Sequence, residues 1–533
     1  MRITNKIMQN NSLYNINNNK VLQDKLSNQM STQQKLTRPS DDPVVAIRAL
    51  RLRTSVSEIT QYYSKNAPDA EEWLKVTSDA LGTVTDVLTD MIKQATKGAN
   101  KDLGSEDLAI ITEQLKSLRD EFYSTGNVDY AGRYVFTGYR TDTPMSFNSE
   151  VEKQNLSYSI TEQTDITKFD TINYTNIGNL DGLTVSNYND TTHAAITEQD
   201  ISNLDIHRLQ LSYDDTATGT KPTIKKVTET TDASGNKIKV ETDLIAADKI
   251  TEVSVDAATD PYQTIEAANK AGTEAVVYVP ETGELLFSDE AYKKVSEDAD
   301  VKAGAEIRVS YTKDDWKNGD LRPENYFVCT STETVNGTAQ KPIEYNQDYL
   351  TANPTDQVIE YDVGYNQTIR VNTKADEVFT TDLDRTIDNL ENSLSTLTTL
   401  ESTMADLKNL IDKTDESSTD YTTLQTQYDA AQKAYTYIRD QVNNTFSSSI
   451  TSLQKNLDAT NVAITDNGTR SKRLDLISNR LMSQKTTYET LQHDNESADI
   501  SEVAIQLTSA ELTYNAALMA TGKIMQSTLM NYI

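Results

Sequence analysis

The residues that could carry out chemistry are few and scattered in this chain. It contains one cysteine, Cys329, and three histidines, His193, His207 and His493. A single cysteine cannot form a disulfide within one chain, and these four residues do not supply a Cys/His set for a metal ion. His493 lies in the polar run LQHDNES, where we expect a solvated side chain.

Motifs for catalysis or ligand binding are also missing. The sequence has no phosphate-binding glycine loop, no G-x-S-x-G and no H-E-x-x-H. The stretch DASGNKIKVETD resembles a calcium loop only weakly, because its glycine is at the fourth position rather than the sixth and no glutamate ends it. Pairs such as Asp314 and Asp315 are ordinary in an acidic protein. We therefore predict no catalytic, cofactor-binding or metal-binding residues and a protein that is not an enzyme.

Length and charge restrict the class of protein further. A chain of 533 residues is too long for one core, and about two to four domains are expected. The net charge of −31 disfavours nucleic acid as a partner, since a duplex repels an acidic surface. No apolar run is long enough to span a bilayer, and the N-terminus lacks the features of a secretory signal peptide. Taken alone, this predicts a cytoplasmic protein unless another export route reads the N-terminus.

The C-terminal segment of the chain has the residue spacing of a coiled coil. Asp499 and Glu502 resemble a helix-capping start. The predicted seam alternates steps of three and four residues, through Ile500, Val503, Leu507, Ala510, Tyr514, Ala517, Thr521 and Ile524. A second apolar stripe contains Leu518, Met525, Leu529 and Tyr532. A helix with two apolar stripes needs partners on more than one side.

The N-terminus shows the same spacing more weakly. Its predicted seam contains Ile3, Ile7, Tyr14 and Val21. Asn10 and Asn17 interrupt this seam, and buried asparagines cost stability while they set register. The run NNSLYNINNNK is a poor helix former, so we expect this segment to be marginal alone and to order only when it is packed.

Longer helices are predicted inside these ends. One runs to a stop at Lys97 and Gly98, and another runs from a Ser105 cap to Gly126. Three further apolar seams have the patterning of a helical bundle and cover residues 383–397, 421–442 and 474–491.

The middle of the chain, between about Met145 and Phe379, reads as β structure. KKVTETTDASGNKIKVETD predicts two strands around a turn at residues 234–236. AVVYVPETGELLF predicts strand, turn at 280–283 and strand, and GAEIRVSYTKDD alternates as a strand. The fold class is therefore α+β, with two helical limbs, a β-rich insertion between them and chain termini that meet.

A firm break separates the first helix from the second, at RPSDDP. Asp42 suits an N-cap and Pro43 the first helical residue, and a residue before proline avoids helical geometry, as a cap requires. With this break the predicted parts are 1–42, 43–144, 145–379, 380–494 and 495–533.

Three segments carry a resemblance to a known family. These are LTRPSDDPVVAIRALRLR at 36–53, GNVDYAGRYVFTGYRTDTPMSF at 126–147, and the C-terminal residues 479–533. They resemble the bacterial flagellar hook-filament junction proteins, or hook-associated protein 3, of the flagellin family. Flagellins usually carry an Asn-Ser-Ala-Lys-Asp-Asp-like run at this break. The signature of the junction proteins in this chain is therefore the run Arg38, Pro39, Ser40, Asp41, Asp42 and Pro43.

The resemblance implies an elongated flagellin-like chain with a structural role. Such proteins form a layer of copies at the tip of the hook, with another hook-associated protein on one side and flagellin or a further junction layer on the other. The resemblance also implies terminal segments that are disordered in the monomer, export through the flagellar type III apparatus without cleavage, and a cytoplasmic chaperone on the C-terminal region. The alternatives are flagellin itself, or an enzyme or adhesin carried by the middle domain.

We expect the assembly interface to use the two ends of the chain. The predicted interface residues are Ile3, Ile7, Tyr14, Val21, Val503, Leu507, Tyr514, Leu518, Ile524, Met525 and Leu529.

Overall fold

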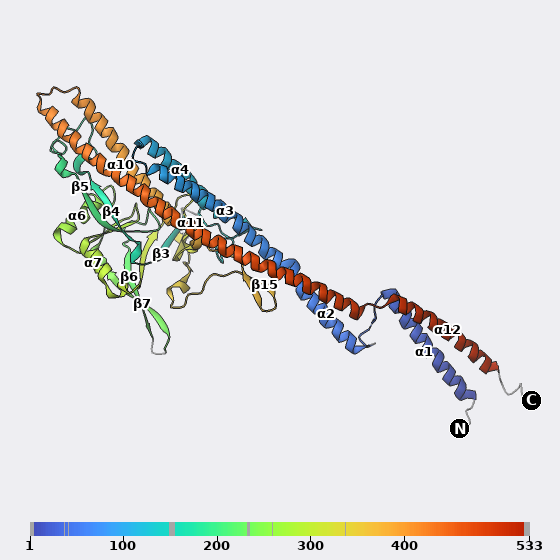
Figure 1. The fold of residues 1–533 in the computed structure, drawn as a ribbon. Helices are drawn as coiled ribbons and strands as arrows, with labels where there is room; N and C mark the ends of the chain where they lie inside the picture. The colour runs from blue at the N-terminus through green and yellow to red at the C-terminus, as the bar shows by residue number, and fades with distance from the viewer. Residues whose placement is uncertain are drawn as a thin grey trace, which may run out of the picture. The chain divides into compact units, whose positions relative to one another are not determined.

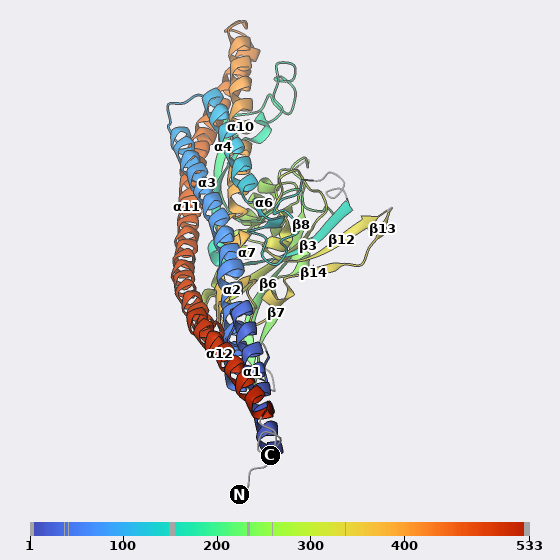
Figure 2. The ribbon, with the colours of Figure 1, turned by 90° about the vertical axis from the view of Figure 1, so that its right-hand side faces the viewer.

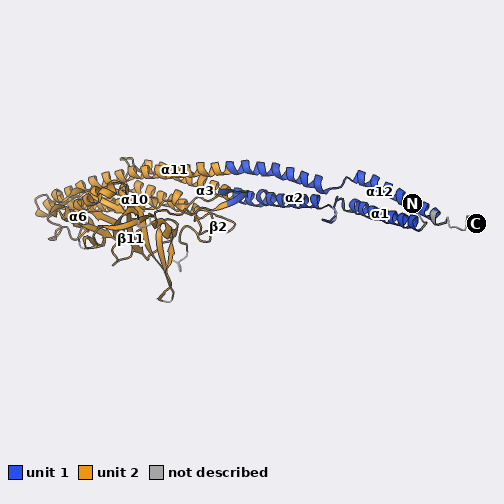
Figure 3. Ribbon diagram, turned by 90° about the horizontal axis from the view of Figure 1, so that it is seen from below, with its two compact units in different colours: residues 1–71, 361–369, 472–533 blue, residues 72–360, 370–471 orange. Residues whose placement is uncertain are grey.

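The protein is described here by a computed structural model, drawn in Figure 1 with the element labels used below. The structure describes residues 5–36, 38–40, 42–148, 155–231, 235–257, 259–335 and 337–526. The chain forms two compact units, coloured separately in Figure 3. Unit 1 contains residues 1–71, 361–369 and 472–533, and unit 2 contains residues 72–360 and 370–471.

Unit 1 is mainly helical. It contains α1 (Asn5–Thr32), α2 (Pro43–Gln61), a π-helical turn (Tyr62–Asn66) and α12 (Ile500–Gln526). It also contains the last part of the 78-residue helix α11 (Thr419–Glu496). The hairpin of β15 (Glu360–Gly364) and β16 (Gln367–Arg370) packs on these helices, where the Asn66 side chain donates a hydrogen bond to the Asp362 carbonyl at 2.7 Å.

The helices of unit 2 form a bundle, as their apolar spacing predicts. They are α3 (Ala67–Gly98), α4 (Ser105–Thr125), α10 (Asp382–Ile411) and most of α11. The predicted seam of α3 is buried, with Leu74, Leu81 and Leu88 almost fully covered. The predicted Ser105 cap is wrong by one residue, because Gly104 is the N-cap and the Ser105 hydroxyl instead contacts Glu401 on α10. The Glu401 carboxylate takes the Ser105 hydroxyl that a local capping bond would use.

The larger sheet of unit 2 is antiparallel. In the described residues it has seven strands in the order β13-β12-β3-β11-β6-β7, and β14 also pairs with β12. Figure 2 labels β3, β6, β7, β12, β13 and β14 of this sheet. Its strands are β3 (Leu156–Thr164), β6 (Thr223–Thr231), β7 (Lys237–Ile245), β11 (Glu306–Lys313), β12 (Val328–Val335), β13 (Thr338–Ala339) and β14 (Ile343–Tyr345). The predicted β6–β7 and β11 strands are confirmed.

A second sheet holds the most buried strands. Its order is β4-β5-β10-β9-β8, from β4 (Phe169–Asn176), β5 (Ser202–Gln210), β8 (Ile250–Glu252), β9 (Val276–Val279) and β10 (Glu284–Phe287). The predicted turn between β9 and β10 is confirmed, and it needs Gly283, which has φ +59° and lies against the Tyr213 carbonyl. Helix α6 (Pro261–Ala271) covers this sheet through Ile265, which packs with Val277 and Leu286.

The α+β class with helical ends and a β-rich middle is confirmed. Two features were not predicted. The middle region also contains the short helices α6 and α7 (Asp289–Glu297), and the separate seams at 421–442 and 474–491 belong to the single helix α11. The predicted division into five parts differs from the two compact units and stays a prediction.

Candidate assembly interface

Helices α1 and α12, together called the terminal pair, pack along a heptad seam within unit 1. On α12 the less exposed positions alternate in steps of four and three, as predicted, and are Val503, Leu507, Ala510, Tyr514, Ala517 and Thr521. The opposing positions on α1 are Gln9, Ser12, Ile16, Asn19, Gln23 and Leu26. Leu26, Val503 and Ala510 form the buried cluster at one end, with Leu507 packed against it.

The seam of α1 differs from the predicted one. Ile7, Tyr14 and Val21 lie outside the contact with α12 and are 49%, 67% and 70% exposed. Ile16 and Leu26 take their place as the buried apolar residues. The sequence of α1 contains apolar residues in two heptad phases, and the contact with α12 uses the phase of Ile16 and Leu26.

The other predicted interface residues fall into two groups. Leu518 is 44% exposed on α12, whereas Val503 is buried. Ile3 and Leu529 lie outside the described residues, and the side chains of Ile524 and Met525 are not among the described ones. The assembly interface as a set therefore stays a prediction.

The breaks in the two limbs lie side by side. The Ala498 N–H donates to the Gln33 carbonyl at 2.9 Å, and the Lys35 N–H donates to the Glu496 carbonyl at 2.7 Å. Gln34 and Ser497 form an antiparallel bridge between them. This pairing satisfies backbone groups that would otherwise be left open where α1 and α11 end. It was missed from the sequence because a two-residue bridge has no periodic pattern.

The RPSDDP break works as predicted at its C-terminal end. Asp42 has extended geometry, with φ −152° and ψ 99°, and its carboxylate accepts hydrogen bonds from the Val44 and Val45 N–H groups at 3.0 and 3.2 Å. Pro43 is the first helical residue of α2. Asp499 caps α12 in the same way, through the Ser501 and Glu502 N–H groups at 2.9 and 3.2 Å. Pro39 and Ser40 lie in a turn, and Asp41 is outside the described residues.

Two side-chain contacts fasten α2 to the end of α11. The Arg53 guanidinium makes two hydrogen bonds of 2.7 Å with the Glu496 carboxylate. The Asn495 amide donates to the Val45 carbonyl at 3.2 Å. A bidentate Arg–carboxylate pair fixes orientation as well as distance. This pair therefore fixes α2 relative to the end of α11 within unit 1.

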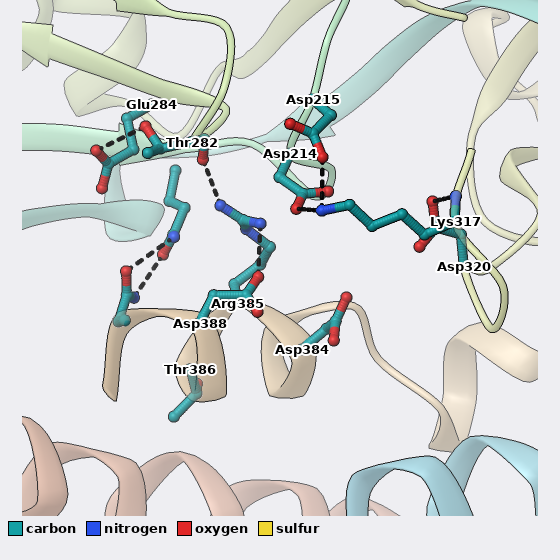
Figure 4. A network of polar contacts seen from close by, with 12 residues as sticks. Asp214, Asp215, Thr282, Glu284, Lys317, Asp320, Asp384, Arg385, Thr386 and Asp388 are labelled. Atoms are coloured by element: carbon teal, nitrogen blue, oxygen red, sulfur yellow. Dashed lines mark hydrogen bonds and ion pairs between the residues drawn. The ribbon is translucent and has the colours of Figure 1, made fainter. Parts of the chain in front are cut away.

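A separate polar network in unit 2 attaches the β-rich region to helix α10. Figure 4 shows Asp214, Lys317 and Asp320 on the β side, opposite Arg385 and Asp388 on α10. We call these five residues the α10 network. Lys317 contacts Asp214 at 2.8 Å and its backbone N–H donates to Asp320 at 2.8 Å. Arg385 pairs with Asp388 at 2.8 Å and donates to the Thr282 carbonyl from the β9–β10 turn.

Burial shifts the pKa values of two carboxyl groups in this network. Burial raises the pKa of Asp320 to about 6, although the nearby Lys313 ammonium lowers it. Burial, followed by the negative charge of Asp384, raises the pKa of Asp388 to about 7. Both shifts arise because a low-dielectric site penalises the ionised carboxylate. The network thus has acids that titrate near neutral pH.

A cleft in unit 2 is polar and contains both lysines and carboxylates. It has a volume of about 820 Å³ and contains Lys168, Lys239, Lys374, Asp356 and Glu306 in its wall. The lysines already have carboxylate partners, at 2.6 Å for Lys239 with Glu306 and 3.1 Å for Lys374 with Asp356. The cleft does not gather the convergent carboxylates that a glycosidase needs.

The described part of the chain offers neither a metal site nor a membrane-spanning helix. Among these residues, no group of three or more His, Cys, Asp or Glu side chains is arranged to hold a metal ion. None of the described helices combines the length and the apolar character that a membrane span requires.

Comparison with known proteins links the N-terminal limb to a family. Residues 3–141 match the family described as bacterial flagellin N-terminal helical region. The chain is 28% identical over 176 residues to flagellar hook-associated protein 3 of Salmonella typhimurium, an alignment that covers 33% of this chain and 55% of that protein. It is 26% identical over 185 residues to the protein of the same name from Escherichia coli, covering 34% of this chain and 58% of that protein. The alignments therefore span little more than half the length of these curated relatives.

Solved structures give a weaker likeness. A crystal structure of FlgL from Xanthomonas campestris aligns with 83% of this chain and 99% of its own, at 12% identity and a TM-score of 0.31. A TM-score this low does not establish a shared arrangement. In sequence, residues 3–141 match the bacterial flagellin N-terminal helical region, and the chain is similar to flagellar hook-associated protein 3.

Proposed function

We propose that this protein is a structural component of the bacterial flagellum that joins the hook to the filament as an adaptor layer. The observation that carries the proposal is the similarity to two proteins named flagellar hook-associated protein 3, together with the flagellin N-terminal region. The proposed role has no catalytic step. The proposed location is the hook-filament junction, reached through the flagellar type III apparatus without a cleaved signal peptide.

The terminal pair supports a role in assembly. Its seam contains many polar residues on α1 and few large apolar ones, so the pair has little burial to hold it together. Large apolar side chains remain exposed on both helices, among them Tyr14, Val21 and Leu518. Exposed apolar stripes of this kind mark surfaces that other chains cover. The proposed partners are further copies of this chain, another hook-associated protein on the hook side and flagellin or a further junction layer on the filament side.

The same surface suggests why a chaperone is needed before export. The predicted stripe from Val503 to Leu529 contains residues that α1 does not cover, such as Leu518 and Met519. A cytoplasmic chaperone that binds this C-terminal region would prevent its aggregation.

Immunogold electron microscopy of intact flagellated cells tests the proposal. An antibody against the β-rich region, residues 155–345, should place gold in one short band where hook meets filament. Flagellin is the alternative function, because it shares the N-terminal region, and it would give gold along the whole filament. Gold that follows the filament would refute the adaptor role.

A further inference from the structure

Lys313, the last residue of β11, is fully buried inside unit 2. Its side chain has an exposed fraction of 0%, although a buried charge is costly unless it is closely paired. The shortest polar contact of Nζ is with a neutral group, because Nζ donates to the Asp214 carbonyl at 2.6 Å. The nearest carboxylate oxygens are farther away, at 3.5 Å on Asp214 and 3.8 Å on Asp320. A lysine amino group is therefore held in the interior beside two carboxyl groups.

Aromatic side chains exclude water from this site. The Trp316 ring lies beside Lys313, with 5.2 Å between Nζ and the ring centroid. Phe147, Tyr158 and Tyr213 pack around Trp316 at centroid distances of 4.8, 5.2 and 5.5 Å. All four rings are buried. A reaction that releases water is favoured in such a site, and its product is protected from hydrolysis.

The two carboxyl groups differ in their affinity for a proton. Burial raises the pKa of Asp320 to about 6, so this carboxyl group takes up a proton readily. Burial acts in the same direction on Asp214, but the charges of Lys313 and Lys317 outweigh it and lower the pKa of Asp214. Lys317 Nζ lies 2.8 Å from the Asp214 carboxylate. Asp320 is thus suited to react as an acid, and Asp214 to accept a proton as a carboxylate.

A backbone group completes the set. The Lys317 N–H donates to Oδ2 of Asp320 at 2.8 Å, and Figure 4 shows Lys317 with Asp214 and Asp320. A donor at this position stabilises the negative charge that develops on the carboxyl oxygen when a nucleophile adds to the carbon. A nucleophile, an acid, a proton acceptor and an oxyanion donor therefore share one site.

We propose that Lys313 and Asp320 form an intramolecular isopeptide bond, with Asp214 as the proton acceptor. The Lys313 ammonium gives one proton to the Asp214 carboxylate, and the resulting amine attacks Cγ of the protonated Asp320 carboxyl group. The Nζ–Cγ bond forms, and Oδ1 leaves as water with the carboxyl hydrogen and one amine hydrogen. This condensation needs no oxidant, reductant or cofactor. Because folding holds the groups together, the step is effectively unimolecular.

The bond lies at the joint where the chain from α4 enters the β-rich region. The Phe147 N–H donates to the Asp320 carbonyl at 2.9 Å, and the Gly319 N–H donates to the Phe147 carbonyl at 3.0 Å. Lys313 belongs to β11, which pairs with β3 and β6 inside the larger sheet. The bond therefore links this sheet covalently to the segment that pairs with the entering chain. The inference goes beyond the proposed function and does not depend on it.

Mass spectrometry of the purified full-length protein tests the bond. The intact protein should be lighter than its sequence by the mass of one water molecule. Trypsin should fail to cleave after Lys313, and residues 309–317 should be recovered as a branched peptide joined through Lys313 to the peptide that begins at Asn318. The full sequence mass with cleavage after Lys313 would overturn the proposal. Loss of water without the branched peptide would also overturn it.

Variants of the two joined residues test the chemistry of the bond. Lys313→Arg and Asp320→Ala should each have the full mass of their sequences. Asp320→Asn can form the same amide by releasing ammonia instead of water, so its product should have the mass of the wild-type product. Loss of water from Lys313→Arg or Asp320→Ala would contradict the assigned bond. If these variants do not fold, the branched peptide of the wild-type protein still decides the question.

The role of Asp214 has its own test. Asp214→Asn keeps the size of the side chain but removes the proton acceptor, so this variant should keep its full mass. Asp315→Asn, at an exposed position of the same loop, is the matched control and should still lose one water. Complete loss of water in Asp214→Asn would refute the role of Asp214. A branched peptide that joins Lys313 to Asp214 would refute the assignment of Asp320 as the acid.

Discussion

Single side chains set how the parts of each unit are attached. In the α10 network, Asp388 has a pKa raised to about 7 by burial and by the charge of Asp384, even though Arg385 pairs with it at 2.8 Å. Desolvation therefore outweighs the ion pair. Arg119 contacts Asp384 at 2.8 Å and lies 3.9 Å from Asp388, so its charge is shared between these two carboxylates. At alkaline pH, the ionised Asp388 carboxylate therefore destabilises the folded state.

This destabilisation predicts how the free energy of unfolding depends on pH. Between about pH 4 and pH 7 the folded state holds a proton on Asp388 that the unfolded chain lacks, so the stability from this group falls as pH rises across this range and levels off above pH 7. Asp388→Asn should raise the free energy of unfolding at pH 8 by roughly 2 kcal/mol, and this advantage should be markedly smaller at pH 5 and lost below about pH 4. Thermal unfolding from pH 5 to pH 8 measures it, with the exposed Asp458→Asn as control. An equal gain at both pH values would contradict the assigned cause.

The Asp42 cap leads to a second prediction at this scale. Asp42→Ala removes the acceptor of the Val44 and Val45 N–H groups and should destabilise the start of α2 by about 1 kcal/mol. Hydrogen exchange of these two amides should accelerate. Asp42→Asn keeps an acceptor and serves as the control, so equal exchange in both variants would show that the cap is not needed.

At the scale of elements, packing chose among patterns that the sequence offers. Helix α12 uses the predicted seam. In it, Val503 and Ala510 are buried with Leu26 of α1, and Leu507 packs against this cluster. Helix α1 has two phases and uses the one that contains Ile16 and Leu26. That phase is the one that packs on Val503 and Ala510, which are far from α1 in sequence.

A charge in this seam should separate the pair. Leu507→Asp puts a carboxylate beside Leu26 and Val503, where its desolvation is costly. We expect lost assembly and lost motility, while unit 2 keeps its thermal transition. Thr513→Asp, on an exposed position of the same helix, is the matched control. Normal filaments on cells that carry the Leu507→Asp variant would refute the role of the seam.

At the scale of the whole molecule, the two units differ in how much apolar surface they bury. Unit 2 contains nearly all of the fully buried large side chains, such as Trp73, Phe122 and Phe287. The terminal pair of unit 1 buries only a few, including Ile16 and Leu26. Ordering a helix costs conformational entropy that so little burial offsets only in part.

Limited proteolysis should therefore distinguish the two units. In the monomer we expect cleavage first within residues 5–42 and 497–526, before any cut in residues 72–360. If the protein assembles as proposed, the same ends should be protected in isolated flagella, because neighbouring copies would cover them. The readout is mass spectrometry of early fragments. Early cuts confined to unit 2 would contradict the expected disorder of the ends.

The sequence alone determined the helical limbs, the β-rich middle, the Asp42 cap and the family resemblance, since these depend on local spacing and residue type. Tertiary structure decided the seam of α1, the Ser105 contact, the length of α11 and the shifted carboxyl groups of the α10 network. Each of these depends on which distant residue is the partner. The periodicity of a single helix leaves that choice open, because a heptad repeat fixes the spacing of a seam but not the side on which a partner packs.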